Sequence, residues 1–78
     1  MIMRDTIIEI LSDLIADFDE NEQAIIDGKV LDSLRILQLI MQLNDEFDIS
    51  IPAGEIKPAN FNSVDAIEAL ITKLLDED

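Results

Sequence analysis

The sequence predicts a small all-α domain with three main helices and one minor helical turn. Three segments repeat apolar residues at spacings of three and four, which is the period of a helix with one buried face. One short segment, residues 47–52, alternates like a β-strand, but the chain offers no second strand to pair with it. With 78 residues, the chain is expected to form one domain, residues 1–78, with a small core.

The first helix is predicted over residues 3–18. Its apolar positions are Met3, Ile7, Ile10, Leu11, Leu14, Ile15 and Phe18. Charged residues lie between them, as expected for an amphipathic helix. The acidic cluster that includes Asp17 and Asp19 predicts its end, because carboxylates are unfavourable at the negative end of the helix dipole.

Residues 19–32 are predicted to form a long connection. Within it, Ala24, Ile25 and Ile26 are expected to pack onto the core, and Asp27-Gly28 is a turn signal. A connection of this length is acceptable if it lies over the helices or serves function.

The second helix is predicted from Asp32 or Ser33, either of which suits an N-cap, to Phe47. At about 100° per residue, its apolar residues form two stripes. The broad stripe, expected to be buried, holds Ile36, Leu39, Ile40, Leu43 and Phe47. The second stripe holds Leu34, Leu37 and Met41 and needs a cover. We expect a partner protein, and the alternative is core packing against the long loop or the last helix.

The remainder is predicted to hold an extended loop, a short turn and two helical pieces. Pro52 disfavours helix before it and is expected to open a turn over residues 53–56. Residues 57–61 should form about one helical turn with Phe61 as an apolar plug. Ser63 is expected to cap the last helix, with Asp65 in its first turn.

The last helix should bury Val64, Ile67, Leu70, Ile71 and Leu74. Residues 76–78 are expected to form a solvated acidic tail.

The charge balance excludes several partner classes. Eighteen acidic residues against five lysines and arginines give a net charge of −13, which repels nucleic acids and anionic membranes and attracts basic protein surfaces. The same charge opposes compaction, so stability should rise with salt. We find no secretion signal and no apolar run of about 18 residues, and cysteine is absent. We therefore expect a cytoplasmic monomer that does not span a membrane.

An enzyme is disfavoured because the chain has no histidine to act as a base for Ser33. A lysine base would have to be Lys29, Lys57 or Lys73, and no motif supports one. The segment beginning at Asp17 imitates an EF-hand loop, but Glu22 stands where glycine is required and Gly28 where the bidentate glutamate is required. We therefore expect neither a catalytic residue nor a metal site.

Ser33 taken alone would be interpreted as an ordinary N-cap, but its surroundings form three ordered blocks. These are Leu31-Asp32-Ser33-Leu34, then Asp45-Glu46-Phe47-Asp48-Ile49-Ser50-Ile51-Pro52, then Asn60-Phe61-Asn62-Ser63-Val64-Asp65-Ala66-Ile67. Together they resemble the acyl carrier protein family, which includes the peptidyl and D-alanyl carriers. The resemblance covers essentially the whole chain.

The resemblance implies an antiparallel four-helix bundle with a short third helix. It also implies that 4′-phosphopantetheine from coenzyme A is attached to Ser33 by a separate phosphopantetheinyl transferase. The chain would then carry acyl or aminoacyl thioesters between biosynthetic enzymes with basic docking surfaces. As partner-recognition residues we expect Asp32, Leu34, Arg35, Leu37, Met41 and Asp45.

Two departures from the family pattern point away from the general fatty-acid carrier. Arg35, Gln38 and Gln42 occupy positions that are usually acidic, and Gly28 lies further upstream of the serine than is common. We expect a specialised stand-alone carrier. The alternative is a small acidic interaction module that uses the Leu34, Leu37 and Met41 stripe while Ser33 serves only as a cap.

Overall fold

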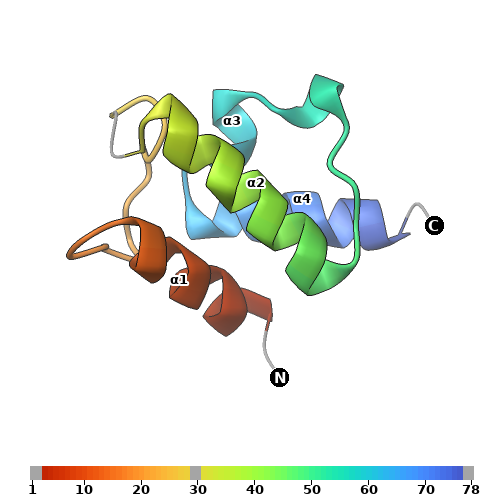
Figure 1. The fold of residues 1–78 in the computed structure, drawn as a ribbon, viewed down its shortest axis with the longest axis horizontal. Coiled ribbons are helices and arrows are strands. Elements are labelled where there is room, and N and C mark those ends of the chain that lie inside the picture. The colour runs from red at the N-terminus through yellow and green to blue at the C-terminus, as the bar shows by residue number, and fades with distance from the viewer. Residues whose placement is uncertain (1–2, 29–30, 77–78) are drawn as a thin grey trace.

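A computed structural model describes residues 3–28 and 31–76 of the chain, apart from the side chain of Ser33. Within these ranges the structure is helical and contains no strand. Its elements are α1 (Met3–Leu14), α2 (Ser33–Phe47), the 3₁₀ turn η1 (Ala53–Glu55), α3 (Pro58–Phe61) and α4 (Val64–Asp76) (Figure 1). This confirms the predicted all-α class, with three main helices and a short one.

The helices pack around one apolar core. Helix α1 contacts both α2 and α4, and α3 contacts α4. Connecting segments also contribute, since Ile25, Leu31 and Ile51 are buried. The buried apolar residues of the helices are Ile7, Ile10, Leu11, Leu39, Ile40, Leu43, Phe61, Val64, Ile67, Leu70 and Ile71. Burial of these side chains is the main source of stability in a domain of this size.

The predicted end of the first helix was wrong, because α1 ends at Leu14 rather than Phe18. The Ile15 N–H still donates to the Leu11 carbonyl at 2.8 Å, but Asp17 adopts a left-handed conformation with φ of 57°. That conformation stops a right-handed helix. Phe18 nevertheless packs against the core as a half-buried side chain outside the helix.

The remaining boundaries agree closely with the sequence predictions. Helix α2 ends at Phe47, where Asp48 takes a left-handed cap conformation and its N–H donates to the Asn44 carbonyl. The Ser63 hydroxyl accepts the Ala66 N–H at 3.0 Å and so caps α4. The predicted start of the acidic tail at Asp76 is one residue too early, because Asp76 is the last residue of α4. The rest of the predicted tail lies outside the described residues.

No helix within the described ranges is long and apolar enough to cross a membrane.

Candidate functional site

The start of α2 is organised by one carboxylate. Asp32 is the N-cap, and its Oδ1 accepts the backbone N–H of Arg35 at 2.8 Å. Its Oδ2 accepts the Arg35 guanidinium Nη1 at 3.2 Å, and its backbone carbonyl accepts the Ile36 N–H. Of the two cap candidates, Asp32 is therefore the cap, and Ser33 is the first helical residue. The hydroxyl of Ser33 lies outside what the structure describes.

The loop before α2 is fastened by Asn62, a residue given no role in the sequence predictions. Its Oδ1 accepts the N–H groups of Ile26 and Asp27 at 2.9 and 3.0 Å. Its Nδ2 donates to the Asp27 carboxylate at 2.8 Å, and its carbonyl accepts the Ile25 N–H. Asn62 belongs to the third motif block. Its position directly after Phe61 was the signal in the sequence that its side chain could bond to buried backbone.

The second apolar stripe of α2 is exposed to solvent, as predicted. Leu34, Leu37 and Met41 are 65%, 58% and 69% exposed. Neither the described part of the preceding loop nor α4 covers them, so the alternative of core packing against these elements is wrong. The other predicted recognition residues, Asp32, Arg35 and Asp45, are exposed on the same helix and its cap. The structure therefore places the predicted recognition residues with described side chains on one accessible element.

A small apolar pocket of about 160 Å³ lies beside the N-terminal half of α2. Ile26 and Ile36 contribute to its lining from the loop and from α2. Ile56, Lys57, Pro58 and Phe61 contribute from the segment that follows the 3₁₀ turn and from α3. The pocket can hold a small hydrocarbon group, since its lining is mainly aliphatic and aromatic.

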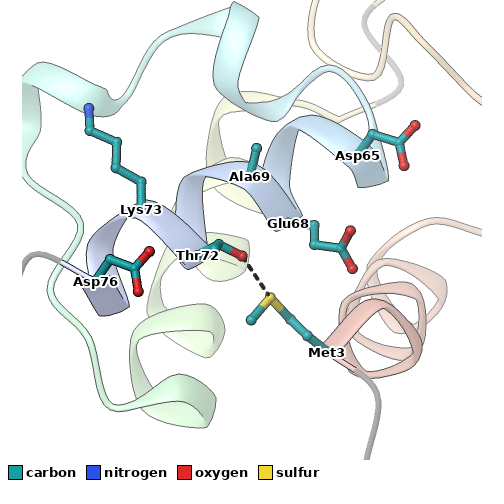
Figure 2. A pocket seen from close by; sticks show the side chains of 7 residues that line it. All are labelled: Met3, Asp65, Glu68, Ala69, Thr72, Lys73 and Asp76. Carbon is teal, nitrogen blue, oxygen red and sulfur yellow. Dashed lines mark hydrogen bonds between the residues drawn. The ribbon is translucent and has the colours of Figure 1, made fainter.

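A shallow depression of about 470 Å³ lies on α4 next to Met3, and none of the residues that line it belongs to α2 (Figure 2). The Thr72 hydroxyl donates to the Met3 sulfur across it at 3.8 Å. Nearby, Arg4 pairs with Asp65, and that hydrogen bond raises the pKa of the Arg4 guanidinium. These contacts join α1 to α4 and so support the fold rather than the start of α2.

Comparison with known proteins identifies the family. Residues 5–71 match the model of the phosphopantetheine attachment site family. A D-alanyl carrier protein from Lactobacillus helveticus is 29% identical over 73 residues, covering 91% of this chain and 92% of the relative. One from Lactococcus lactis is 31% identical over 71 residues, covering 91% and 90%. One from Streptococcus sanguinis is 31% identical over 70 residues, covering 87% and 89%.

Proteins of this family hold a covalent 4′-phosphopantetheine group, receive it from a phosphopantetheinyl transferase and serve biosynthetic enzymes without being catalysts themselves. The matches confirm the predicted family, prosthetic group and non-catalytic role. They extend over most of the chain and over most of each relative. The chain therefore belongs to the phosphopantetheine-binding carrier proteins.

Proposed function

We propose that Ser33 bears the 4′-phosphopantetheine arm. The observation that carries this proposal is the position of Ser33, which directly follows the Asp32 cap as the first residue of α2, inside the family match. Asp32, Leu34 and Arg35 are all exposed, so their side chains leave the approach to this turn open. The N-terminal amides of a helix also favour the negative charge of a phosphodiester.

Ser33 needs no base of its own in this scheme. The transferase brings coenzyme A and magnesium, and the Ser33 oxygen forms the new bond to phosphorus. That oxygen loses its proton, and adenosine 3′,5′-bisphosphate leaves as the pyrophosphate bond breaks. This role fits a chain without histidine. The arm supplies a thiol on which acyl or aminoacyl groups are held as thioesters.

We further propose that partner enzymes dock on the exposed stripe of α2. Leu34, Leu37 and Met41 supply apolar contact area. A single exposed apolar side chain is ordinary, but a contiguous group of them indicates a surface that binds another protein. Asp32 and Arg35 lie at the serine end of this stripe, and Asp45 lies toward the other end. Basic partner surfaces are favoured by the net charge of −13.

The cargo is proposed to be a small acyl or aminoacyl group. Three relatives that match over most of their length are named D-alanyl carrier proteins, which favours an aminoacyl cargo. The pocket beside α2 has a volume of only about 160 Å³, which suits a short side chain or acyl group better than a long one. Arg35, Gln38 and Gln42 leave the first half of α2 without a carboxylate, which favours a specialised carrier over the general fatty-acid carrier.

We also propose that residues 1–78 form a single carrier domain. The helices form an antiparallel bundle, with residues 15–32 as the long loop that delivers Asp32 and Ser33 to one end of it. We propose that the protein works in the cytoplasm as a monomer, where coenzyme A and its partner enzymes are available.

Localisation of the arm tests the proposed attachment residue. The protein is loaded with coenzyme A by a phosphopantetheinyl transferase, digested and sequenced by tandem mass spectrometry. The modified peptide should contain Ser33, and Ser33→Ala should remain unmodified. Ser50→Ala is the matched control, because Ser50 is an exposed serine outside the helices, and it should load normally. Modification at any other serine would overturn the assignment.

A further inference from the structure

The loop before α2 is tied to the helices through Asn62. This residue lies at the junction of α3 and α4, at the same end of the molecule as the start of α2 (Figure 1). Its carbonyl accepts the Ile25 N–H at 2.9 Å, and its Oδ1 accepts the N–H groups of Ile26 and Asp27 at 2.9 and 3.0 Å. The other hydrogen bonds of the described loop residues, 16–28 and 31, join residues within the loop itself. Asn62 is therefore the point at which hydrogen bonding joins this loop to the rest of the fold.

The tie continues from Asn62 to the residue before the cap of α2. Ile25, whose N–H is bonded to Asn62, is fully buried, and its carbonyl accepts the Leu31 N–H at 3.3 Å. Leu31 is also buried, and it directly precedes the Asp32 cap. A displacement of the loop at Asn62 would therefore be passed to Asp32 and to Ser33, which follows it.

The contact of Asn62 with Asp27 requires an amide. Its Nδ2 donates to the Asp27 carboxylate at 2.8 Å, while its Oδ1 accepts the two backbone N–H groups. An asparagine side chain offers one acceptor and one donor group, whereas an aspartate would place two carboxylates side by side. Because Asn62 is half-buried, water replaces these bonds only in part when the side chain is removed.

We propose that Asn62 is a positioning residue for the modification of Ser33, because it holds the loop in the arrangement that presents the start of α2 to the transferase. This inference rests on the proposed attachment at Ser33. Without the tie the loop populates other arrangements, and the transferase binds only the competent fraction of the molecules. Its apparent affinity then falls by that fraction. The KM for the protein rises, whereas kcat stays the same because the bound complex is unchanged.

Hydrogen exchange of the unloaded protein tests the tie without any modification of Ser33. Asn62→Ala should speed exchange of the Leu31 and Ile36 amides about fivefold or more relative to the Leu70 amide. Neither of the first two amides is bonded to Asn62, whereas Leu70 lies in the core face of α4 and reports on global opening. Equal acceleration at all three amides, or none at Leu31 and Ile36, would overturn the proposal.

Transferase kinetics test the positioning role. Asn62→Ala should raise the KM of a phosphopantetheinyl transferase for the protein about threefold or more and leave kcat unchanged. Ser63→Ala is the matched control, because it removes the cap of α4 next to Asn62 but no bond to the loop, and its KM should stay unchanged. An equal rise in KM in the two variants would show a general effect of lost stability and would overturn the positioning role. Absence of loading in the original protein would instead refute the attachment at Ser33.

An exchange of the side chains of Asn62 and Asp27 provides the sharpest test. Asn62→Asp alone should raise KM, because two carboxylates then repel each other. Asp27→Asn alone should have little effect, since an asparagine oxygen can accept the same Nδ2 donor. The double variant keeps the net charge of −13 and reverses the direction of the side-chain bond. Its KM should return to within about twofold of the original value. A KM as high as that of Asn62→Asp would contradict the proposal.

Discussion

Asp32 and Arg35 are joined twice at the start of α2. One carboxylate oxygen of Asp32 caps the Arg35 backbone at 2.8 Å, and the other meets the Arg35 guanidinium at 3.2 Å. The residue before the proposed attachment serine is therefore held by the helix that the serine begins. These two contacts fix the backbone conformation of the residue before Ser33. The Arg35 guanidinium also compensates part of the negative charge of Asp32.

The cap should matter more for stability than the ion pair does. Asp32→Ala removes the acceptor for the Arg35 N–H and should lower the free energy of unfolding by about 1 kcal/mol. Arg35→Ala removes only an exposed pair and should change it by less than about 1 kcal/mol. Urea denaturation measures both, with Asp32→Asn as a control that retains a side-chain acceptor. An equal loss of unfolding free energy in the two alanine variants would show that the N-cap contributes no more to stability than the ion pair does.

The two apolar stripes of α2 should separate recognition from folding. Leu39→Ala empties a fully buried site and should cost about 2–5 kcal/mol of stability. Leu37→Ala acts at a 58% exposed side chain and should leave stability within about 0.5 kcal/mol while weakening partner binding. Thermal denaturation and titration of a purified partner enzyme measure the two effects. A large stability loss in Leu37→Ala would show that this side chain serves the core.

Arg35 should discriminate against partners of the general fatty-acid carrier. A guanidinium at this point repels basic side chains on such an enzyme. Arg35→Glu should therefore strengthen binding to a fatty-acid-pathway enzyme, measured by calorimetric titration. Arg35→Gln should have a smaller effect of the same sign. Unchanged or weaker binding of Arg35→Glu would count against a role of Arg35 in partner choice.

Salt should stabilise the fold. A net charge of −13 on 78 residues creates self-repulsion that dissolved ions screen. Raising sodium chloride from about 0.01 M to about 0.5 M shortens the screening length from ~30 Å to well below ~8 Å. The melting temperature should rise over this range. A constant or falling melting temperature would mean that the few ion pairs outweigh the repulsion.

The helical pattern and the main caps were predictable from the sequence because they depend on local chemistry. Apolar spacing located α2 and α4, and Ser63 was identified as a cap from its place before Val64. The end of α1 was not predictable from periodicity, since Phe18 continues the apolar spacing although the left-handed Asp17 has already ended the helix. Phe18 reaches the core from a loop, which a helical pattern does not distinguish from a further turn.

Long-range polar contacts were the part that the sequence did not reveal. Asn62 fastens residues 25–27 across some 35 positions, and Lys73 meets Glu55 across 18. A chain with 18 acidic residues gives no local sign of which carboxylate is paired. The second stripe was more accessible to prediction, because the helical period separates Leu34, Leu37 and Met41 from the buried stripe of α2, although only the structure shows that nothing described covers them.

The most direct test of the carrier account is the intact mass of the protein after incubation with coenzyme A, magnesium and a broad-specificity phosphopantetheinyl transferase. Ser33→Ala is treated in parallel, and a known carrier in the same tube confirms that the transferase is active. The account predicts that the protein with Ser33 gains one phosphopantetheine and that the Ser33→Ala variant gains none. No gain in a folded protein, while the known carrier is modified, would contradict the account and favour an interaction module that uses Ser33 only at the start of α2.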